Sequence, residues 1–359
     1  MTKNNIFEVT NLCLPDRKEI KVFNIPICQF GYKIKNSKKK IFFRVFPRFS
    51  FQEKFFEEAI KLDNKCTDFY ITKQASGEPY LLTYLIDDLI KKDNAKNPMV
   101  IGIKKYHKDI FYMFANNIKC DIVQTIGYNA IQMFPKKEYI YKKRKFHIYL
   151  PSYFFKNFYE EVTKNSDKHY FSEIRNFLEL ESKDNCEYSK NVCIAPEKYD
   201  SLQQKIKNSG LNENNFIYMA PEATACKDYD EDFWLELITR LKNAGFDIYL
   251  NTLKKYKHLS NIVKIFDTDF QETYLLASKA KSIVALRCGM IEMLTTLDKK
   301  MDVIYTGYKK RNTPTIEVLS SNSLTKLPNI KANINEYNTD LIQKEELINK
   351  IITNIMEEH

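Results

Sequence analysis

The segment from Phe216 to Tyr308 constrains the fold most, because two hydrophobic patterns alternate along it. The apolar run Phe216–Met219 ends in a polar stretch, an amphipathic helical pattern then continues to Gly245, and a second apolar run follows at Asp247–Leu250. Further on, Ile283–Leu286 leads into a glycine turn and another helical pattern. Strands that alternate with helices predict a parallel sheet, whose ligands bind beyond the carboxyl ends of the strands. Both polar turns fall at such ends, so a phosphate-bearing ligand is expected there.

The first half of the chain carries the same alternation. Short apolar runs at 68–72, 99–103 and 121–125 are separated by helical patterns, so a second doubly wound sheet is expected. The chain is therefore predicted to be an α/β protein with two Rossmann-like domains that face a central cleft. The expected parts are an N-terminal β-ribbon at 1–50, one domain at 51–190, a second domain at 191–338, and a helix at 339–359 that packs back on the N-terminal domain.

Two elements are expected after Tyr308. The run Thr315–Leu319 is predicted to be a short strand. The last helix, Thr339–Met356, is expected to bury one apolar face, because its large aliphatic residues recur at helical spacing. These residues are Leu341, Ile342, Leu347, Ile348, Ile351 and Ile352.

Residues 1–50 differ in character from the rest. Two similar runs, Lys21–Ile27 and Lys40–Pro47, flank the lysine-rich stretch Lys33–Lys40. Prolines within such runs favour an edge ribbon over a central strand. Two interpretations stay open: a surface hairpin without a binding role, or a basic, aromatic ribbon that docks to a membrane or a lipid-linked acceptor.

The charge of the chain bounds its partners and its compartment. The formal net charge is +10, which suits anionic ligands such as sugar nucleotides or the anionic face of a membrane. Binding of nucleic acid is not expected, because no recognition module is visible. The eight cysteines are scattered without a C-x-x-C pair, which indicates reduced thiols and no zinc site. With no signal peptide and no run of about 18 apolar residues, a cytoplasmic protein is expected, soluble or peripheral on the inner membrane.

Three stretches combine strand, turn and helix in one order. Tyr70–Leu85 places a glycine and an acidic residue before a helix, Met219–Leu237 places a lysine in the polar loop, and Ser282–Leu294 holds the glycine turn. Together they resemble the heptosyltransferase-like family, glycosyltransferase family 9, which has the two-domain GT-B arrangement. The resemblance implies transfer of a sugar from a nucleotide donor, whose diphosphate is received at the amino end of the helix in the third stretch. That family usually has Asp-Thr-Gly-x-x-His there, whereas this chain has Arg287-Cys-Gly-Met-Ile-Glu292.

The expected donor site follows from the charge that develops in the reaction. Cations and backbone N–H groups must offset the negative charge on the departing diphosphate when no metal is present. Gly289 allows a tight turn, Arg287 can grip phosphate oxygens, and Lys227 can supply a point charge. The simpler alternatives are a salt bridge between Arg287 and a buried carboxylate, and a solvated Lys227. The expected donor-binding residues are Glu222, Thr224, Lys227, Arg287, Cys288, Gly289, Met290 and Glu292.

The acceptor side depends on Glu78. An acidic residue at this place in the family is the candidate base that deprotonates the acceptor hydroxyl, and a positioned carboxylate can do that work. The alternative is a glutamate that stabilises a helix amino end next to Pro79. Lys73, Ser76 and Gly77 are the expected acceptor-binding residues.

No metal and no cofactor are expected. Asp267-Thr-Asp269 is the one D-x-D match, and such a pair could hold a divalent metal on a diphosphate. The alternative makes Asp269 the N-cap of a helix at Gln271–Ala280. Trp234 is expected in the core. A hydrolase triad is not expected, because the histidines lack paired carboxylate or serine spacing.

The predicted function is a glycosyltransferase that acts on a bacterial lipopolysaccharide or capsule glycan. Its partners would be a nucleotide-sugar donor and a glycan or lipid-linked acceptor. Two rival hypotheses are a polysaccharide pyruvyl- or phospho-group transferase on a similar fold, and a non-catalytic scaffold that binds a glycan or a partner enzyme.

Overall fold

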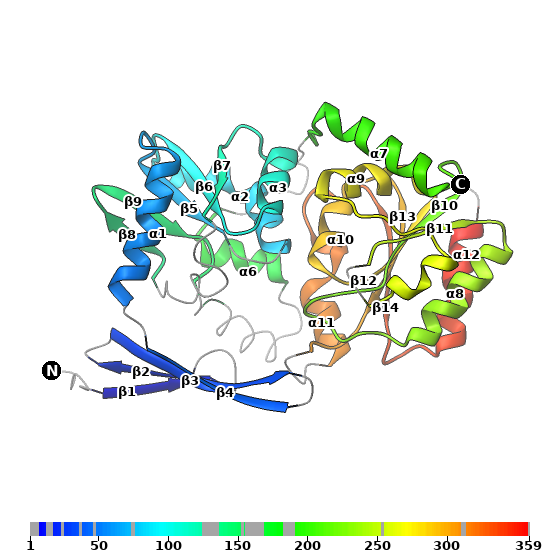
Figure 1. The fold of residues 1–359 in the computed structure, drawn as a ribbon, viewed down its shortest axis with the longest axis horizontal. Helices are drawn as coiled ribbons and strands as arrows, with labels where there is room; N and C mark the ends of the chain where they lie inside the picture. The colour runs from blue at the N-terminus through cyan, green and yellow to red at the C-terminus, as the bar shows by residue number, and fades with distance from the viewer. Residues whose placement is uncertain are drawn as a thin grey trace. The chain divides into compact units, whose positions relative to one another are not determined.

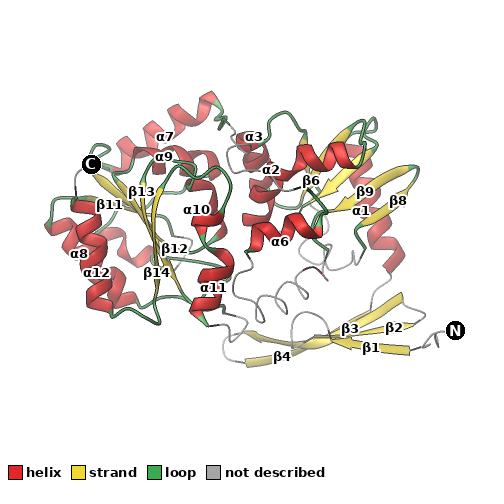
Figure 2. Ribbon diagram, turned by 180° about the vertical axis from the view of Figure 1, so that it is seen from behind, coloured by secondary structure: helices red, strands yellow, loops and turns green. Residues whose placement is uncertain are grey.

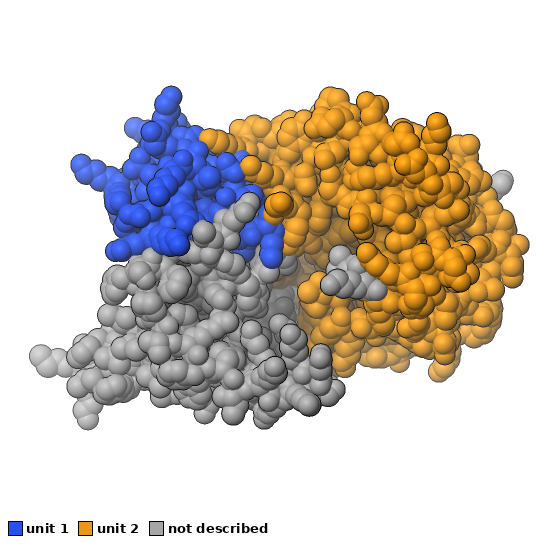
Figure 3. Space-filling view, in the orientation of Figure 1, with its two compact units in different colours: residues 1–74, 94–104, 120–160 blue, residues 75–93, 105–119, 161–359 orange. Residues whose placement is uncertain are grey.

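The structure is a computed structural model in two compact units. It describes residues 7–11, 17–22, 25–35, 38–45, 48–72, 76–123, 136–151, 154, 169–181, 191–252, 255–309 and 314–357, with the backbone alone before residue 53. The first unit comprises 1–74, 94–104 and 120–160, and the second comprises 75–93, 105–119 and 161–359 (Figure 3). None of the described helices is long and apolar enough to cross a bilayer.

The N-terminal ribbon is a four-stranded antiparallel meander (Figure 1). Its strands are β1 (Phe7–Asn11), β2 (Arg17–Val22), β3 (Ile25–Lys35) and β4 (Lys38–Val45). The ribbon is confirmed, but the expectation that its prolines mark an edge strand is wrong for Pro26, since β3 lies between β2 and β4. Pro26 is accommodated because it pairs with Lys21, where the register of β2 and β3 shifts.

The first unit also contains a mostly parallel sheet with the strand order β7-β6-β5-β9-β8. The strands are β5 (Asp68–Ile71), β6 (Pro98–Gly102), β7 (Cys120–Ile122), β8 (Glu138–Tyr141) and β9 (Arg144–Ile148), and β8 is the antiparallel edge. Helix α1 (Arg48–Leu62) supplies Phe55, Phe56 and Ala59 to the core beneath the sheet. The rings of Phe56 and Phe146 lie 4.1 Å apart, so aromatic packing joins the helix to β9.

The second unit contains a fully parallel sheet with the order β11-β10-β12-β13-β14. Its strands are β10 (Phe216–Ala220), β11 (Asp247–Leu250), β12 (Ser282–Leu286), β13 (Lys300–Tyr305) and β14 (Asn333–Asn338). Every residue of β10 and β12 is buried, as expected for strands that helices cover on both faces. Helices α8 (Glu231–Asn243) and α12 (Lys344–Met356) lie on one face, and α9 (Phe270–Lys279) and α10 (Gly289–Leu294) on the other (Figure 2).

The helices that follow β5 and β6 belong to the second unit. Helix α2 (Gly77–Lys92) packs on α10, and α3 (Tyr106–Phe114) packs on α2 and α9. The sequence placed both helices in the N-terminal domain at 51–190, so this grouping differs from the expected boundary. The remaining helices are α6 (Tyr170–Phe177), α7 (Pro196–Ser209), α11 (Thr315–Asn322), and the short 3-10 helices η2 (Lys257–Asn261) and η3 (Leu324–Lys326).

Two expectations near the C-terminus are corrected. Thr315–Leu319 lies in helix α11, and the strand of this region is β14, which the sequence did not indicate. The final helix buries its apolar stripe against α8 and β13 of the second unit, whereas we expected it to pack on the N-terminal domain. Leu347, Ile348 and Ile351 make this contact possible because all three are fully buried on one helix face.

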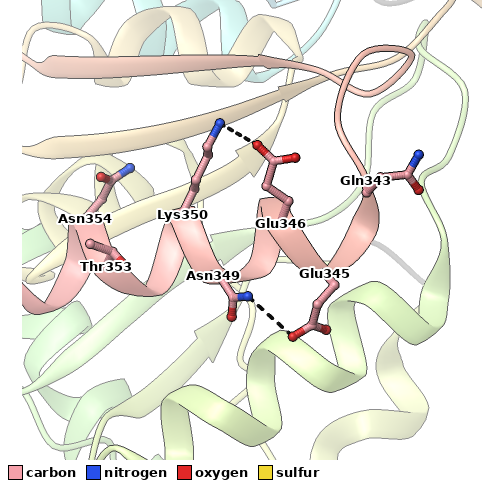
Figure 4. A pocket seen from close by; sticks show the side chains of 7 residues that line it. All are labelled: Gln343, Glu345, Glu346, Asn349, Lys350, Thr353 and Asn354. Carbon is pink, nitrogen blue, oxygen red and sulfur yellow. Dashed lines mark hydrogen bonds and ion pairs between the residues drawn. The ribbon is translucent and has the colours of Figure 1, made fainter.

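The opposite face of α12 is polar and lines an open pocket of about 550 Å³ (Figure 4). Its side chains pair with one another: Lys350 lies 2.8 Å from Glu346, and Glu345 accepts from Asn349 and from Arg240 of α8. This face is therefore mostly a solvated ion-pair surface, although Asn354 at its end also donates to Asp302 at 2.9 Å and to Tyr337 at 2.7 Å.

A pair of leucine substitutions tests this packing. Leu347→Ala removes a fully buried side chain, and we expect the free energy of unfolding to fall by about 2–5 kcal/mol through lost burial and a residual cavity. Leu341→Ala makes the same change at a side chain that is 78% exposed, and we expect an effect below about 0.5 kcal/mol. Urea denaturation measures both variants, and equal losses would contradict the packing.

Candidate active site

The candidate residues collect where the strand order of the second sheet reverses. The chain leaves β10 toward α8 and leaves β12 toward α10, and these neighbouring strands lie on either side of the reversal. In doubly wound sheets this switch point, at the carboxyl ends of the strands, is where ligands bind.

The loop after β10 is fixed by the loop after β13. The backbone N–H of Lys227 donates to the Gly307 carbonyl at 2.7 Å, and the Thr306 hydroxyl donates to the Lys227 carbonyl at 2.7 Å. Lys309 also donates to the Ala223 carbonyl at 2.9 Å. These bonds hold the loop backbone, whereas the Lys227 side chain is exposed and its Nζ has no partner among the described residues.

The two other candidates of this loop lie in different surroundings. Glu222 accepts a hydrogen bond from the Thr252 hydroxyl and one from the backbone N–H of Lys255 at 3.2 Å. Its carboxylate therefore ties the loops after β10 and β11 together. The Thr224 side chain is exposed.

Arg287 is buried and fully engaged by protein groups. Its Nε donates to the Asn322 carbonyl at 3.1 Å, Nη1 to the Cys288 carbonyl at 2.9 Å, and Nη2 to Glu292 Oε1 at 2.7 Å. Burial opposes ionisation of the guanidinium, but Glu292 holds the pKa of Arg287 above its usual value. The structure thus contains the salt bridge that the sequence left as an alternative, and Arg287 holds the β12–α10 turn together.

Two glycines bring the expected acceptor and donor residues into contact. A methyl group on Gly289 would lie 2.5 Å from the Gly77 nitrogen and 2.8 Å from Ser76 Oγ. One on Gly77 would lie 2.6 Å from Glu292 Oε2. A larger residue at position 289 would meet the backbone of α2, so the close approach of these two amino ends requires Gly289. A larger residue at position 77 would displace the Glu292 carboxyl group.

The carboxyl group of Glu292 lies over the first turn of α2. It is 4% exposed, and its Oε2 has no hydrogen-bond partner among the described residues. Burial raises the pKa of Glu292, Arg287 lowers it, and the charge of Glu78 raises it further. A carboxylate at a helix amino end is stabilised by the helix dipole, so Glu292 takes the position that an anionic ligand of α2 would favour.

Glu78 lies in the first turn of α2, where the sequence expected it, and is half-buried. Burial of the Tyr106 phenol, together with the nearby charge of Glu78, raises the pKa of Tyr106 to about 12. Both interpretations of Glu78, as a base or as a helix-end residue, fit this position. Ser76 is the N-cap without a side-chain cap bond, and Lys73 lies outside the described residues.

The remaining candidates of the β12–α10 turn have structural contacts. Burial raises the pKa of the Cys288 thiol, which disfavours a thiolate there. Met290 Sδ accepts from Asn251 Nδ2 at 3.2 Å, so it contacts the residue that follows β11. Trp234 is fully buried in the core, as predicted.

The sequence did not predict a buried hydrogen-bond network near Arg287. His169 Nε2 donates to the Ser323 carbonyl at 2.9 Å, and burial lowers the pKa of His169 to about 4, which keeps it neutral. Glu336 accepts from Tyr305 and Ser323, both at 2.5 Å. No local pattern marks these residues, because they come from elements far apart in the chain. Thr252 and Lys309 could have been found, since each follows the carboxyl end of a strand in the same sheet.

Two histidines do have carboxylate partners. His147 Nε2 lies 3.3 Å from Asp68 Oδ1 in the first unit, and His258 Nε2 lies 3.0 Å from Glu231 on the surface. The Thr67 hydroxyl donates to Asp68 Oδ2 at 2.6 Å, so it contacts the carboxylate of the first pair.

The D-x-D match is a helix cap. Asp269 Oδ1 accepts from the Glu272 N–H at 2.9 Å, and Glu272 Oε2 accepts from the Asp269 N–H at 3.0 Å, which together form a capping box on α9. Within the described part of the chain, no group of three histidine, cysteine or acidic residues is placed to hold a metal ion.

Comparison with known proteins gives the fold. No protein-family model and no curated protein matches this sequence. A solved structure of a glycosyl transferase of family 9 from Veillonella parvula DSM 2008 matches with a TM-score of 0.53 and 12% identity, over 82% of this chain and 98% of that chain. The fold is that of a family 9 glycosyltransferase. The predicted resemblance is thus confirmed for the fold.

Two further structures show weaker similarity. The E. coli ADP-heptose lps heptosyltransferase II matches with a TM-score of 0.46 at 9% identity, over 81% of this chain and 98% of that one. The E. coli heptosyltransferase WaaC with ADP matches with a TM-score of 0.45 at 11% identity, over 80% of this chain and 99% of that one. The family 9 fold is assigned from the Veillonella structure alone.

Arg287 can be tested against a matched surface arginine. We expect Arg287→Ala to lower the free energy of unfolding by about 3–5 kcal/mol, because it leaves Glu292 buried without its cation. Arg240→Ala removes a surface arginine that pairs with Glu236 and Glu345, and we expect a much smaller loss of stability. Urea denaturation compares the two. An Arg287→Ala protein as stable as the Arg240→Ala protein would contradict the structural role.

Proposed function

We propose that this protein is a glycosyltransferase that transfers a sugar from a nucleotide-sugar donor to a bacterial cell-surface glycan, without a metal. The observation that carries the proposal is the contact of α2 and α10 at Gly77 and Gly289, at the switch point of a sheet with the family 9 fold. The proposal is supported by the position of Glu78 in the first turn of α2, where its charge acts on Glu292 of the turn that the resemblance assigns to the donor. The acceptor would be a lipopolysaccharide or capsule glycan, or its lipid-linked precursor.

On the donor side, Lys227 is the residue best placed to meet a diphosphate. Its backbone is fixed by two hydrogen bonds and its ammonium group is exposed, so a ligand can bind it without breaking an internal contact. Backbone N–H groups at the β12–α10 turn would add to this charge. Glu222, Thr224, Cys288, Met290 and Glu292 are proposed to shape the donor site, and Arg287 is proposed to position its turn.

On the acceptor side, Glu78 would remove the proton of the acceptor hydroxyl. The oxygen of that hydroxyl would attack the anomeric carbon of the donor sugar. The bond from that carbon to the diphosphate breaks, and the nucleotide leaves with the bonding electron pair. Ser76, Gly77 and Lys73 are proposed to hold the acceptor. The donor would lie on the turn after β12, and the acceptor on the first turn of α2, which groups with the same unit although the sequence assigned it to the N-terminal domain. The protein would be cytoplasmic and peripheral on the inner membrane.

One observation favours a second candidate, the non-catalytic scaffold. Arg287 was the cation expected to bind the diphosphate, but it is paired with Glu292. The Glu292 carboxylate also covers the amino end of α2. A protein with these contacts could keep the fold and bind a glycan or a partner enzyme without turning over a donor.

Donor binding separates the two candidates. We expect one nucleotide among CMP, CDP, UDP, GDP, ADP and their sugars to stabilise the protein with or without Mg²⁺, by about 2.7 kcal/mol at 100 times its dissociation constant. Thermal-shift measurements detect this. Lys227→Ala should weaken the affinity roughly tenfold to hundredfold through loss of a charged hydrogen bond, with the unliganded melting temperature unchanged.

The matched control is Lys207→Ala, which removes an exposed lysine of α7 and should leave the affinity unchanged. If no nucleotide shifts the melting temperature, the transferase proposal is wrong and the scaffold is favoured.

The role of Glu78 is tested once the donor is known. We expect Glu78→Gln to lower the rate of sugar transfer by about 10²–10⁴-fold, since the amide cannot accept the proton, while donor affinity stays the same. Glu197→Gln is the matched control, because Glu197 also follows a helix start next to a proline, at Pro196. Release of the nucleotide product measures the rate, and a fully active Glu78→Gln enzyme would remove Glu78 from the mechanism.

A further inference from the structure

The β8–β9 hairpin of the first unit is basic on the outside and packed on the inside. Its inner residues Tyr139 and Tyr141 lie on Phe56 of α1, with ring centroids 5.9 and 5.5 Å away. Arg144 anchors the base of the hairpin by donating to the carbonyls of Cys66 at 3.0 Å and Asn64 at 2.7 Å. These contacts hold the inner side of the hairpin on α1 and on the loop before β5.

The outward residues are mostly lysines, together with one large aliphatic side chain and one carboxylate, Glu138, which lies 3.8 Å from His147 Nδ1. Ile140 is 72% exposed and pairs across the strands with Lys145, which is also exposed. The other exposed lysines of this hairpin and its approach are Lys136, Lys137, Lys142 and Lys143. Lys142 lies 2.8 Å from Glu57, whereas Lys143 and Lys145 have no acidic partner among the described residues.

The turn of this hairpin carries a local conformational cost. Lys142 and Lys143 both have a positive φ, 48° and 61°, which is the backbone that two-residue hairpin turns require. Asparagine and glycine are preferred at such positions, because other residues meet steric strain there. Lysines at both positions lower the stability of the turn, so we infer that they are present for their charge.

We propose that the β8–β9 hairpin docks the protein to an anionic phospholipid surface, by its lysines and by insertion of Ile140. Lysine ammonium groups suit lipid phosphates, and an aliphatic side chain suits the acyl boundary. Nucleic acid is disfavoured at β8–β9, because the aromatic residues Tyr139 and Tyr141 pack inward and Arg144 is engaged. This inference specifies the membrane contact of the proposed function, and it can be tested without a donor.

The test is cosedimentation of the full chain with vesicles of phosphatidylcholine alone or with about 30 mol% phosphatidylglycerol. We expect binding to the anionic vesicles only, and weaker binding as salt is raised. Lys143→Glu/Lys145→Glu should reduce the affinity at least roughly 25-fold, on the basis of a fivefold effect for each lysine near an anionic surface. The control Lys207→Glu/Lys331→Glu makes the same charge change at exposed lysines of the second unit and should bind at least fivefold more tightly than the hairpin variant.

A second variant separates docking from folding. Lys143→Gly relieves the positive φ, so its melting temperature should be equal to or higher than that of the original chain, while its affinity for anionic vesicles falls roughly fivefold. Salt screens the attraction between the lysines and the anionic vesicles. We therefore expect Ile140→Ser to weaken the vesicle binding that remains at high salt.

Three results would overturn the inference. These are equal binding to neutral vesicles, unchanged binding by the Lys143→Glu/Lys145→Glu variant, or no binding to anionic vesicles. Tighter binding to single-stranded RNA with the same dependence on these lysines would assign the hairpin to nucleic acid instead. Because lipid binding is measured without a nucleotide, its failure would leave the transferase proposal intact.

Discussion

The contact between the amino ends of α2 and α10 organises the candidate site. It exists because Gly289 lacks a side chain, and it is closed by Glu292, which lies over Gly77 and pairs with Arg287. The two helices begin in segments more than two hundred residues apart. Their meeting brings Glu78, from the first half of the chain, to the same place as the turn after β12.

Arg287 shows how burial changes the meaning of a residue. As a motif residue it suggested a direct grip on phosphate, because guanidinium groups match phosphate oxygens. In the fold it donates to two carbonyls and one carboxylate, and the Asn322 carbonyl that it reaches is also bound by Tyr305. Its charge is used to hold three segments together. The side chain of Lys227, in contrast, is exposed.

The accuracy of sequence reasoning followed the range of the interactions involved. Trp234, the Asp269 cap and the parallel strands of the second sheet were predicted correctly, since each depends on a short pattern or on local hydrogen bonds. The strand expected at Thr315–Leu319 is a helix, and the strand β14 went unrecognised because its polar composition resembles a loop. The network of His169 and Glu336 has no local signal at all.

The sequence by itself determined the class of the fold and the places where chemistry could occur. Apolar runs that alternate with helical patterns require a parallel sheet, and polar residues at the ends of those runs mark its ligand-binding edge. Only the tertiary structure decided which candidates meet, that Arg287 pairs with Glu292, and that α12 packs on the second sheet. The physical reason is that periodicity fixes which face of an element is buried, whereas the partner of that face depends on contacts between residues far apart in the chain.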